Sequence, residues 1–172
     1  MNEVIKNMIE RRTVRKYKAD QISDEQLDAI LEAGLYAPNG RGMQKTVMVV
    51  IQDKETRDYV AKLNAAVMDS TADPFYGAPT VIVVLSERGR VTTVEDGSAV
   101  MTNLVNAAHS VGVDSGWIHR AGEVFDSPEG KELLKKWGVE GDYVGIGNCI
   151  LGYRDCDYPE AAPRKEGRIV RI

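Results

Sequence analysis

The chain has 172 residues, with 22 Lys and Arg against 26 Asp and Glu, and a formal net charge of −4 at pH 7. That length suits one domain over residues 1–172, with an extended basic tail from about residue 154. The acidic balance disfavours general binding to nucleic acid. No apolar run is long enough to span a bilayer and no signal peptide begins the chain, so we expect a cytoplasmic protein without membrane contact.

Helix and strand signals alternate in the N-terminal half. Ser23 and Gln26 form a capping-box pattern, which predicts the start of a helix. Pro and Asn-Gly in APNGRG at 37–42 indicate a loop. The expected elements in chain order are a helix over 2–10, a helix over 24–35, a strand over 47–52, a helix over 56–69 and a central strand over 80–86.

The C-terminal half begins with the strongest helix signal. Apolar side chains recur at intervals of three and four from Val100 to Val111, which predicts a helix over 96–112 with Asp96 as its cap. Because the elements interleave without regular βαβ units, we predict an α+β fold with a mainly antiparallel sheet flanked by helices. The remaining elements are a strand over 115–118, a helix over 128–137 and a strand over 143–153.

Several classes of site are disfavoured by the absence of their patterns. The chain has no GxGxxG or P-loop motif, which argues against those nucleotide sites. Cys149 and Cys156 are not spaced as a redox pair or as part of a zinc site, so no metal is predicted. His109 lies within the apolar helix pattern and is interpreted as a packing residue. No Ser/His/Asp arrangement stands out, so no nucleophile is predicted.

The sequence RRTVRKYK at 11–18 concentrates positive charge in an acidic chain. If it is extended, period-two geometry places Arg11, Thr13, Arg15 and Tyr17 on one face. Guanidinium and hydroxyl groups in such a row suit a phosphate together with a polar anion. Taken alone, a solvated basic strand or a nucleic-acid patch is the simpler interpretation, because short basic runs are common.

The order of motifs along the chain resembles the nitroreductase-like flavoprotein family. The matching segments are RRTVRKY at 11–17, LYAPNGRGMQ at 35–44, FYGAPTVIVV at 75–84, DGSAVMTNLVNAAHSVGVDSGWI at 96–118, GIGNCILGY at 145–153 and APRK at 162–165. Together they cover nearly the whole chain in the family's order. Two positions depart from the pattern: Gly42 replaces an Asn, and Lys45–Thr46 replaces Pro-Trp.

The resemblance implies a nitroreductase-like sandwich that works as a homodimer, with FMN at the subunit interface. The implied activity is electron transfer from NADH or NADPH to an electron-poor acceptor, such as a nitroaromatic, quinone or activated alkene, by a ping-pong mechanism. Three alternatives stay open: a reductive dehalogenase, a protein that binds FMN or handles flavin without turnover, and a nucleic-acid-binding module, which is the least favoured.

The resemblance also assigns roles to residues around the flavin ring. Arg15 lies at the N1 and O2 edge, where its charge stabilises the reduced ring. A backbone N–H in the segment 117–120 reaches N5, and His119 is considered as a proton donor, although a lone loop histidine is more often positional. Asn64 either bonds the pyrimidine edge or is simply an exposed helical residue. Trp117 either walls the cofactor or packs in the core.

The phosphate end is assigned to basic residues from both ends of the chain, Arg11 and Arg12 with Arg164 and Lys165. In the loop at 35–44, Gln44 is the last residue that matches the family pattern. The full set of predicted cofactor-binding residues is Arg11, Arg12, Thr13, Arg15, Pro38, Asn39, Gly40, Gly42, Gln44, Asn64, Trp117, Ile118, His119, Arg164 and Lys165.

Overall fold

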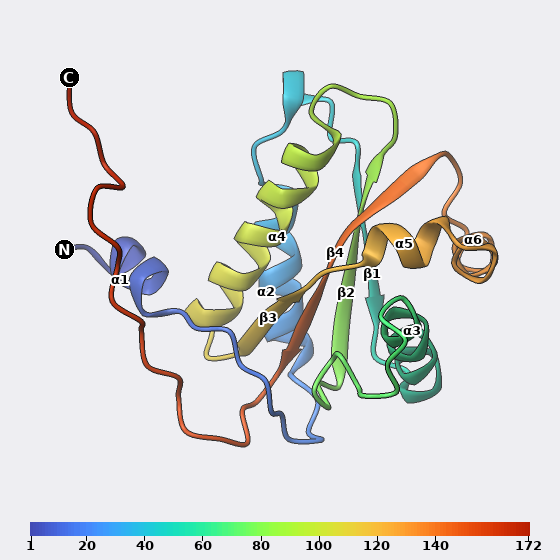
Figure 1. Cartoon of the computed structure of the whole chain (residues 1–172), viewed down its shortest axis with the longest axis horizontal. Helices are drawn as coiled ribbons and strands as arrows, with labels where there is room; N and C mark the ends of the chain where they lie inside the picture. The colour runs from blue at the N-terminus through green and yellow to red at the C-terminus, as the bar shows by residue number, and fades with distance from the viewer.

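A four-stranded antiparallel sheet lies at the centre of the computed structural model, which describes residues 1–172 (Figure 1). The strand order is β1-β2-β4-β3, and each neighbouring pair is antiparallel. The strands are β1 Thr46–Ile51, β2 Thr80–Glu87, β3 Asp114–Ile118 and β4 Tyr143–Gly152. The predicted α+β class, the antiparallel sheet and the central position of the 80–86 strand are confirmed.

Helices cover both faces of the sheet. α2 and α4 lie on one face, while α3, α5 and α6 lie on the other (Figure 1). The helices are α1 Glu3–Glu10, α2 Asp24–Leu35, α3 Lys54–Ala66, α4 Thr93–Ser110, α5 Ala121–Asp126 and α6 Pro128–Lys136, with a 3₁₀ turn η1 at Gly40–Gly42. The predicted capping box at the start of α2 is present. The sequence interpretation missed α5, which is too short to give a periodic signal.

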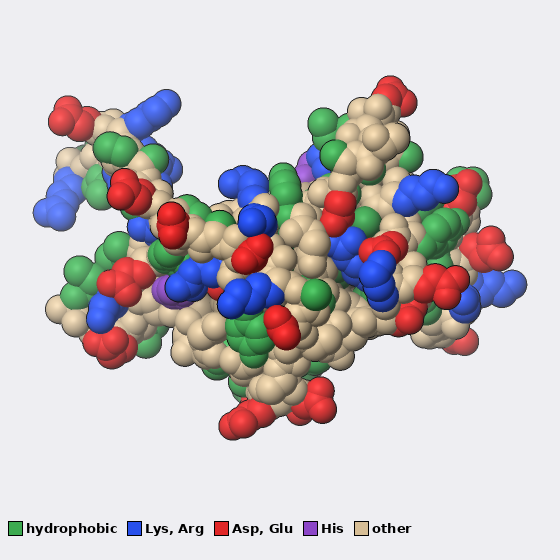
Figure 2. Space-filling view, turned by 90° about the horizontal axis from the view of Figure 1, so that it is seen from below, with side chains coloured by type: hydrophobic (Ala, Val, Ile, Leu, Met, Phe, Trp, Pro, Cys, Tyr) green, Lys and Arg blue, Asp and Glu red, His purple; other side chains and the backbone are tan.

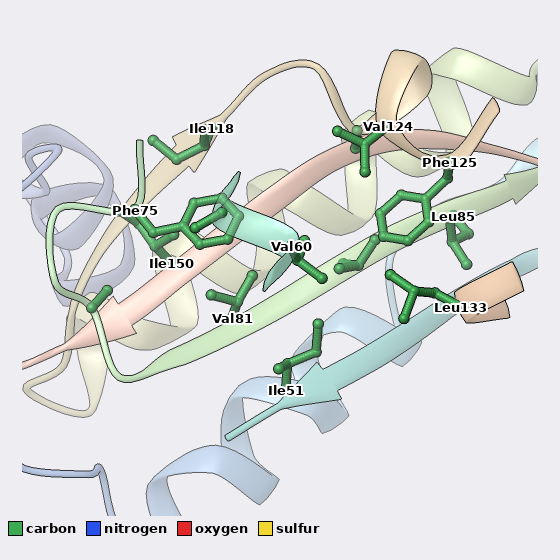
Figure 3. Close-up of a cluster of buried hydrophobic side chains, with 14 of the residues drawn as sticks. Ile51, Val60, Phe75, Val81, Leu85, Ile118, Val124, Phe125, Leu133 and Ile150 are labelled. Carbon is green, nitrogen blue, oxygen red and sulfur yellow. The ribbon is translucent and has the colours of Figure 1, made fainter. Parts of the chain in front are cut away.

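Two hydrophobic clusters hold the layers together, one on each face of the sheet. Alternate residues of β2 divide between them, with Val81, Val83 and Leu85 on the α3/α5/α6 face and Ile82 and Val84 on the α2/α4 face. Figure 3 shows the first cluster, in which side chains from helices and loops meet the strands. Because both faces are covered, β2 is a continuous apolar run rather than an alternating one.

Two local expectations are corrected by the structure. Thr92, not Asp96, occupies the N-cap position of α4, and Asp96 lies within the first turn. The helix predicted over 56–69 begins two residues earlier, because the side chain of Asp53 accepts the N–H of Thr56 at 2.8 Å. Asp53 therefore caps α3 through a local bond, whereas the side chain at the N-cap position of α4 makes no capping bond.

The basic segment is not a regular strand. Val14 and Tyr17 are both buried in the α3/α5/α6 cluster, so the inward spacing is three rather than two. Tyr17 therefore does not share the exposed face of Arg15, as period-two geometry had predicted. The segment makes only isolated bridges, at Thr13 and Tyr17. Burial of its two apolar side chains sets its path.

The C-terminal segment leaves the sheet after β4 and passes α1 before it ends away from the body (Figure 1). Tyr158 and Pro159 are half-buried, and every residue from 160 to 172 is exposed. None of the helices has the length and apolar character that crossing a membrane requires.

Candidate functional site

The basic segment lies along the edge strand of the sheet. Thr13 forms a parallel bridge with Ser115 of β3, and the N–H of Val14 donates to the Ser115 carbonyl at 3.0 Å. Burial of Val14 fixes this attachment from the core side. The basic segment is therefore held against the first part of β3.

Tyr158, from the start of the tail, fastens the other end of this segment. Its hydroxyl accepts the N–H of Arg12 at 3.0 Å and donates to the Glu10 carbonyl at 3.1 Å. Its ring stacks on His109 of α4, with centroids 6.0 Å apart and planes inclined by 8°. His109 is a half-buried packing residue, in agreement with its interpretation from sequence. No sequence pattern indicated the role of Tyr158, because its partners come from α1 and α4.

The basic residues of the segment differ in their surroundings. Arg12 donates through Nη1 to the carbonyls of Ile9 and Arg11, at 2.6 and 2.8 Å, and its buried Nε has no partner. Arg11 is half-buried, Arg15 is exposed, and neither takes part in a salt bridge of the chain. Lys16 pairs with Asp155 at 2.9 Å, and this carboxylate raises the pKa of the lysine. Arg11, Arg15, Lys18 and the Arg12 Nε thus have no acidic partner and no side-chain hydrogen bond within the chain.

The chain leaving β3 is held by two buried asparagines. Asn148 of β4 donates through Nδ2 to the Ile118 carbonyl at 3.4 Å, and Asn64 of α3 donates to the His119 carbonyl at 2.9 Å. The Nε of Arg120 in turn donates to Oδ1 of Asn64 at 3.2 Å. Because Asn64 is 0% exposed, the alternative of an exposed helical residue is wrong. Direct contact between Asn64 and a flavin ring stays a prediction.

Trp117 and His119 project from this stretch toward solvent. Trp117 is 39% exposed and packs over Gly147, where a Cβ would lie only 2.4 Å from the indole Nε1. Only glycine at 147 allows the ring to lie this close to β4. His119 is exposed, whereas Ile118 is buried in the α3/α5/α6 cluster. The expectation of core packing for Trp117 is therefore wrong, and the residue is available as a wall.

The loop predicted at 37–42 is anchored at the start of α4. The N–H of Gly40 donates to Oδ1 of Asp96 at 2.8 Å, and the hydroxyl of Thr92 donates to Oδ2 at 3.1 Å. A Cβ at Gly40 would lie 2.2 Å from the Thr92 hydroxyl, so glycine is required there. Asn39 accepts the N–H of Gln44 at 2.9 Å. Pro38, Gly42 and Gln44 are exposed on this loop.

The loop and the basic segment lie toward opposite ends of α4 (Figure 1). Asp96 holds the loop and His109 holds Tyr158, which binds Arg12. At about 1.5 Å per helical residue, Asp96 and His109 are roughly 20 Å apart along the axis. One chain therefore joins the basic segment to β3 at Ser115 and the loop to the start of α4, at separate places.

The tail residues Arg164 and Lys165 are exposed and make no hydrogen bond or salt bridge within the chain. The structure does not join them to Arg11 or Arg12. Their predicted contact with a phosphate stays a prediction. The chain also contains no group of three or more His, Cys, Asp or Glu side chains placed to hold a metal ion.

The model of the nitroreductase family matches residues 8–153, most of the chain. The chain belongs to the nitroreductase family. An NADPH-flavin oxidoreductase of Vibrio harveyi is 30% identical over an aligned length of 183 residues. The alignment covers 99% of this chain and 73% of the relative. This chain therefore matches the family in the order of its motifs and in sequence.

Solved structures of other nitroreductases agree with the fold. A Bacteroides fragilis nitroreductase with bound FMN has a TM-score of 0.90 at 28% identity, with both chains covered in full. A Desulfitobacterium hafniense nitroreductase with bound FMN has a TM-score of 0.89 at 27% identity, covering 100% of this chain and 99% of that one. The nitroreductase-like fold predicted from sequence is confirmed.

Three side chains near the site were given no role by the sequence interpretation, namely those of Asn148, Arg120 and Tyr158. One of them left a signal in the sequence. Asn148 interrupts the apolar strand GIGNCILG, and a buried polar residue in a central strand requires a bonding partner. Arg120 and Tyr158 lie in polar loops, where their residue types are ordinary. Their partners are distant in sequence, so only the folded chain identifies them.

Proposed function

We propose that the protein is an FMN-dependent oxidoreductase that transfers electrons from NADH or NADPH to an electron-poor acceptor. The bridge between Thr13 and Ser115 carries this proposal, because it holds the basic segment against β3, the strand that leads into residues 117–120. Membership of the nitroreductase family and the FMN-bound relatives support the same cofactor. We treat residues 1–172 as a single domain with a basic tail.

The donor set of this region fits a phosphate-bearing flavin. Arg11 has no acidic partner, and Nε of Arg12 and the hydroxyl of Ser115 are buried without partners. Unpaired buried donors are unfavourable unless a ligand or water satisfies them. Guanidinium groups bind phosphate oxygens through paired N–H donors. We therefore assign Arg11, Arg12 and Thr13 to the phosphate and Arg15 to the ring.

A homodimer completes the site in this proposal. The loop at 38–44 lies roughly 20 Å from the basic segment of its own chain, estimated from the helix rise along α4. A second copy can supply the loop that its partner lacks at this point. Exposed apolar side chains on α1 offer a surface for such contact, namely Val4, Ile5, Met8 and Ile9. In such a dimer, each site combines the basic segment of one chain with the 38–44 loop of the other.

Bound FMN supplies the redox chemistry, since it accepts a hydride equivalent from NADH or NADPH and passes electrons to a second substrate in ping-pong order. The chain binds and orients the cofactor. Arg15 places an unpaired positive charge at the site, which stabilises negative charge on the reduced ring. Exposed His119 is a candidate proton donor to the acceptor. We propose nitroaromatics, quinones and activated alkenes as acceptors.

A nucleic-acid-binding role is less well supported by the surface. Figure 2 shows Lys and Arg side chains interspersed with Asp and Glu over this face. A nucleic-acid site would instead need a continuous basic surface along the phosphate backbone. The arrangement of charge favours a small anion over a polyanion.

The first experiment measures cofactor binding and reduction. We expect the purified full-length protein, incubated with FMN and then desalted, to retain flavin absorbance at about 450 nm, a value typical of this cofactor class. Anaerobic NADH or NADPH should bleach that band, and a nitroaromatic or quinone should restore it. Absence of bound flavin would refute the proposal. If FMN binds but neither NADH nor NADPH bleaches it, the protein binds the cofactor without the proposed reaction. That result would refute the enzyme assignment.

A second experiment separates the ring from the phosphate. Arg15→Gln should lower the two-electron potential of bound FMN while changing its affinity for oxidised FMN little, because the charge acts mainly on the reduced ring. Lys16→Gln is the matched control, since Lys16 is already paired with Asp155. Equal potentials in Arg15→Gln, Lys16→Gln and the unmodified protein would remove Arg15 from its assigned role.

A further inference from the structure

We infer that Asn64 and Asn148 are positioning residues that aim the backbone N–H groups of His119 and Arg120 at the flavin. The inference rests on the proposed function, because it concerns how this chain presents its donors to FMN. Its starting observation is that two successive carbonyls, those of Ile118 and His119, are each bound by a buried asparagine amide.

Peptide geometry converts these two bonds into an orientation of N–H groups. In a trans peptide the C=O of one residue and the N–H of the next point in opposite directions. The chain has no cis peptide bonds. Holding the Ile118 carbonyl inward therefore turns the His119 N–H outward, and holding the His119 carbonyl does the same for Arg120. Neither N–H donates to another backbone group of the chain.

The polarity of the Asn64 amide is set by a third residue. Arg120 donates through Nε to Oδ1 of Asn64, so Nδ2 is the end that faces the His119 carbonyl. Reversing the amide would bring two donors together on one side and two acceptors together on the other. Because Asn64 is fully buried, water does not compete for these bonds. The network fixes one orientation of the peptide between His119 and Arg120.

Asn148 makes the same kind of bond at an unfavourable position. It lies beside Val83 in the ladder between β2 and β4 and is 1% exposed, and its Oδ1 has no partner. A buried acceptor without a partner lowers stability, and a valine would fit the strand without that penalty. An asparagine at this position is explained by its side-chain Nδ2, which donates to the Ile118 carbonyl and holds it in place.

The backbone between these asparagines is itself constrained. Arg120 has a φ of 72°, a left-handed conformation that is uncommon for a residue other than glycine. Such conformations persist where surrounding contacts hold them, and they often mark functional sites. Contacts from α3 and β4 meet here on the chain between β3 and α5. The two N–H groups are therefore presented by a rigid support rather than by a free loop.

The expected consequence concerns the balance between oxidised and reduced flavin. N5 of oxidised flavin accepts a hydrogen bond, whereas N5 of the reduced ring already carries hydrogen. A fixed N–H donor at this atom favours the oxidised ring, so its loss should raise the potential. A role confined to folding would instead weaken the binding of both redox states alike and leave the potential unchanged.

The test uses Asn64→Ala and Asn148→Val, two uncharged variants in different elements. For either folded variant, bound to FMN, we expect the affinity for reduced relative to oxidised flavin to increase about tenfold, which corresponds to a rise of about 30 mV for a two-electron couple. The nitrogen chemical shift of FMN labelled at N5 should also move toward that of free FMN. Asn103→Ala is the matched control, because Asn103 donates to the Ala33 carbonyl between α4 and α2.

Arg120→Lys provides a further variant if neither asparagine variant folds, since it keeps the positive charge and removes the Nε donor that orients Asn64. We expect a shift of the same sign and smaller size. An unmodified protein that binds no FMN would overturn the proposed function. Normal FMN binding and reduction in the unmodified protein, with potential and N5 shift unchanged in the folded variants, would overturn this inference alone.

Discussion

The two faces of the sheet are packed by different means. The α2/α4 cluster consists of apolar side chains, with the buried carboxylate of Asp96 at the start of α4. The α3/α5/α6 face buries three polar side chains, those of Arg57, Asn64 and Asn148. The three polar residues bond to backbone carbonyls, those of Ala78 and His119 in loops and that of Ile118 at the end of β3. The α2/α4 face therefore relies mainly on packing, with Asp96 holding one loop at Gly40, whereas the other face has three buried polar side chains that fix backbone carbonyls.

This difference shows where polar burial is useful. Aliphatic contacts are not directional, so they hold a helix on a sheet without fixing the orientation of a particular peptide. Hydrogen bonds from buried amide and guanidinium groups are directional and fix individual carbonyls. The free energy of unfolding should accordingly respond differently to substitutions on the two faces.

The largest expected effect is on the α2/α4 face. Leu104 of α4 is 0% exposed, and Leu104→Ala should lower the free energy of unfolding by about 3 kcal/mol, because it removes apolar contacts and leaves a cavity. Urea unfolding followed by circular dichroism measures this change. Leu35→Ala, at an exposed position, is the control and should change stability by less than about 0.5 kcal/mol. Equal effects would contradict the burial of Leu104 in the α2/α4 cluster.

A smaller loss of stability is expected from a substitution on the α3/α5/α6 face. Arg57 bonds Asp73 at 2.6 Å and the Ala78 carbonyl at 3.0 Å, and its guanidinium lies over Phe75. Arg57→Met should destabilise the chain by about 2 kcal/mol, because it leaves a buried acceptor and a carboxylate unpaired. The same unfolding measurement applies.

Arg88→Met is the matched control for Arg57, because Arg88 pairs with Asp126 and Asp142 at the surface. Surface pairs contribute little, so a loss below about 1 kcal/mol is expected. If the two arginine variants lost equal stability, the proposed directional role of the buried guanidinium would be wrong.

The smallest expected effect is on how the free energy of unfolding depends on alkaline pH. Burial raises the pKa of the Cys149 thiol from 9.0 to about 12, with Arg11 opposing the shift, and burial also raises the pKa of Tyr17. The folded chain thus keeps protons that the unfolded chain releases, so stability is complete below about pH 9 and falls as the pH rises toward 12. Each such group contributes a slope of at most about 1.4 kcal/mol per pH unit.

Cys149→Ala should reduce this slope between pH 9 and pH 10, where Cys149 titrates in the unfolded chain before Tyr17 does. Urea midpoints at a series of pH values measure it. The exposed Cys156 provides the control, since Cys156→Ala should leave the slope unchanged. Identical slopes in both cysteine variants would show that Cys149 is not protected as its burial indicates.

Much of the fold could be predicted because its signals are local. The Ser23 capping box, the apolar period of α4 and the β-branched run of β2 depend on neighbours in sequence. The errors occurred where distant contacts decide. Asp96 bonds Gly40 rather than capping α4, and Tyr17 turns inward with Val14. In both cases a tertiary contact outweighs the local pattern.

The sequence by itself determined the four strands, every helix except α5, and the motif order that marks the nitroreductase family, because periodicity, capping and short motifs are properties of consecutive residues. Only the tertiary structure decided how the motifs meet. It placed the basic segment on β3, kept the loop of residues 38–44 at the far end of α4, and set Asn64 and Asn148 behind two successive carbonyls. Hydrogen bonds between residues far apart in the chain have no local pattern, so they arise only when the packed layers bring their partners together.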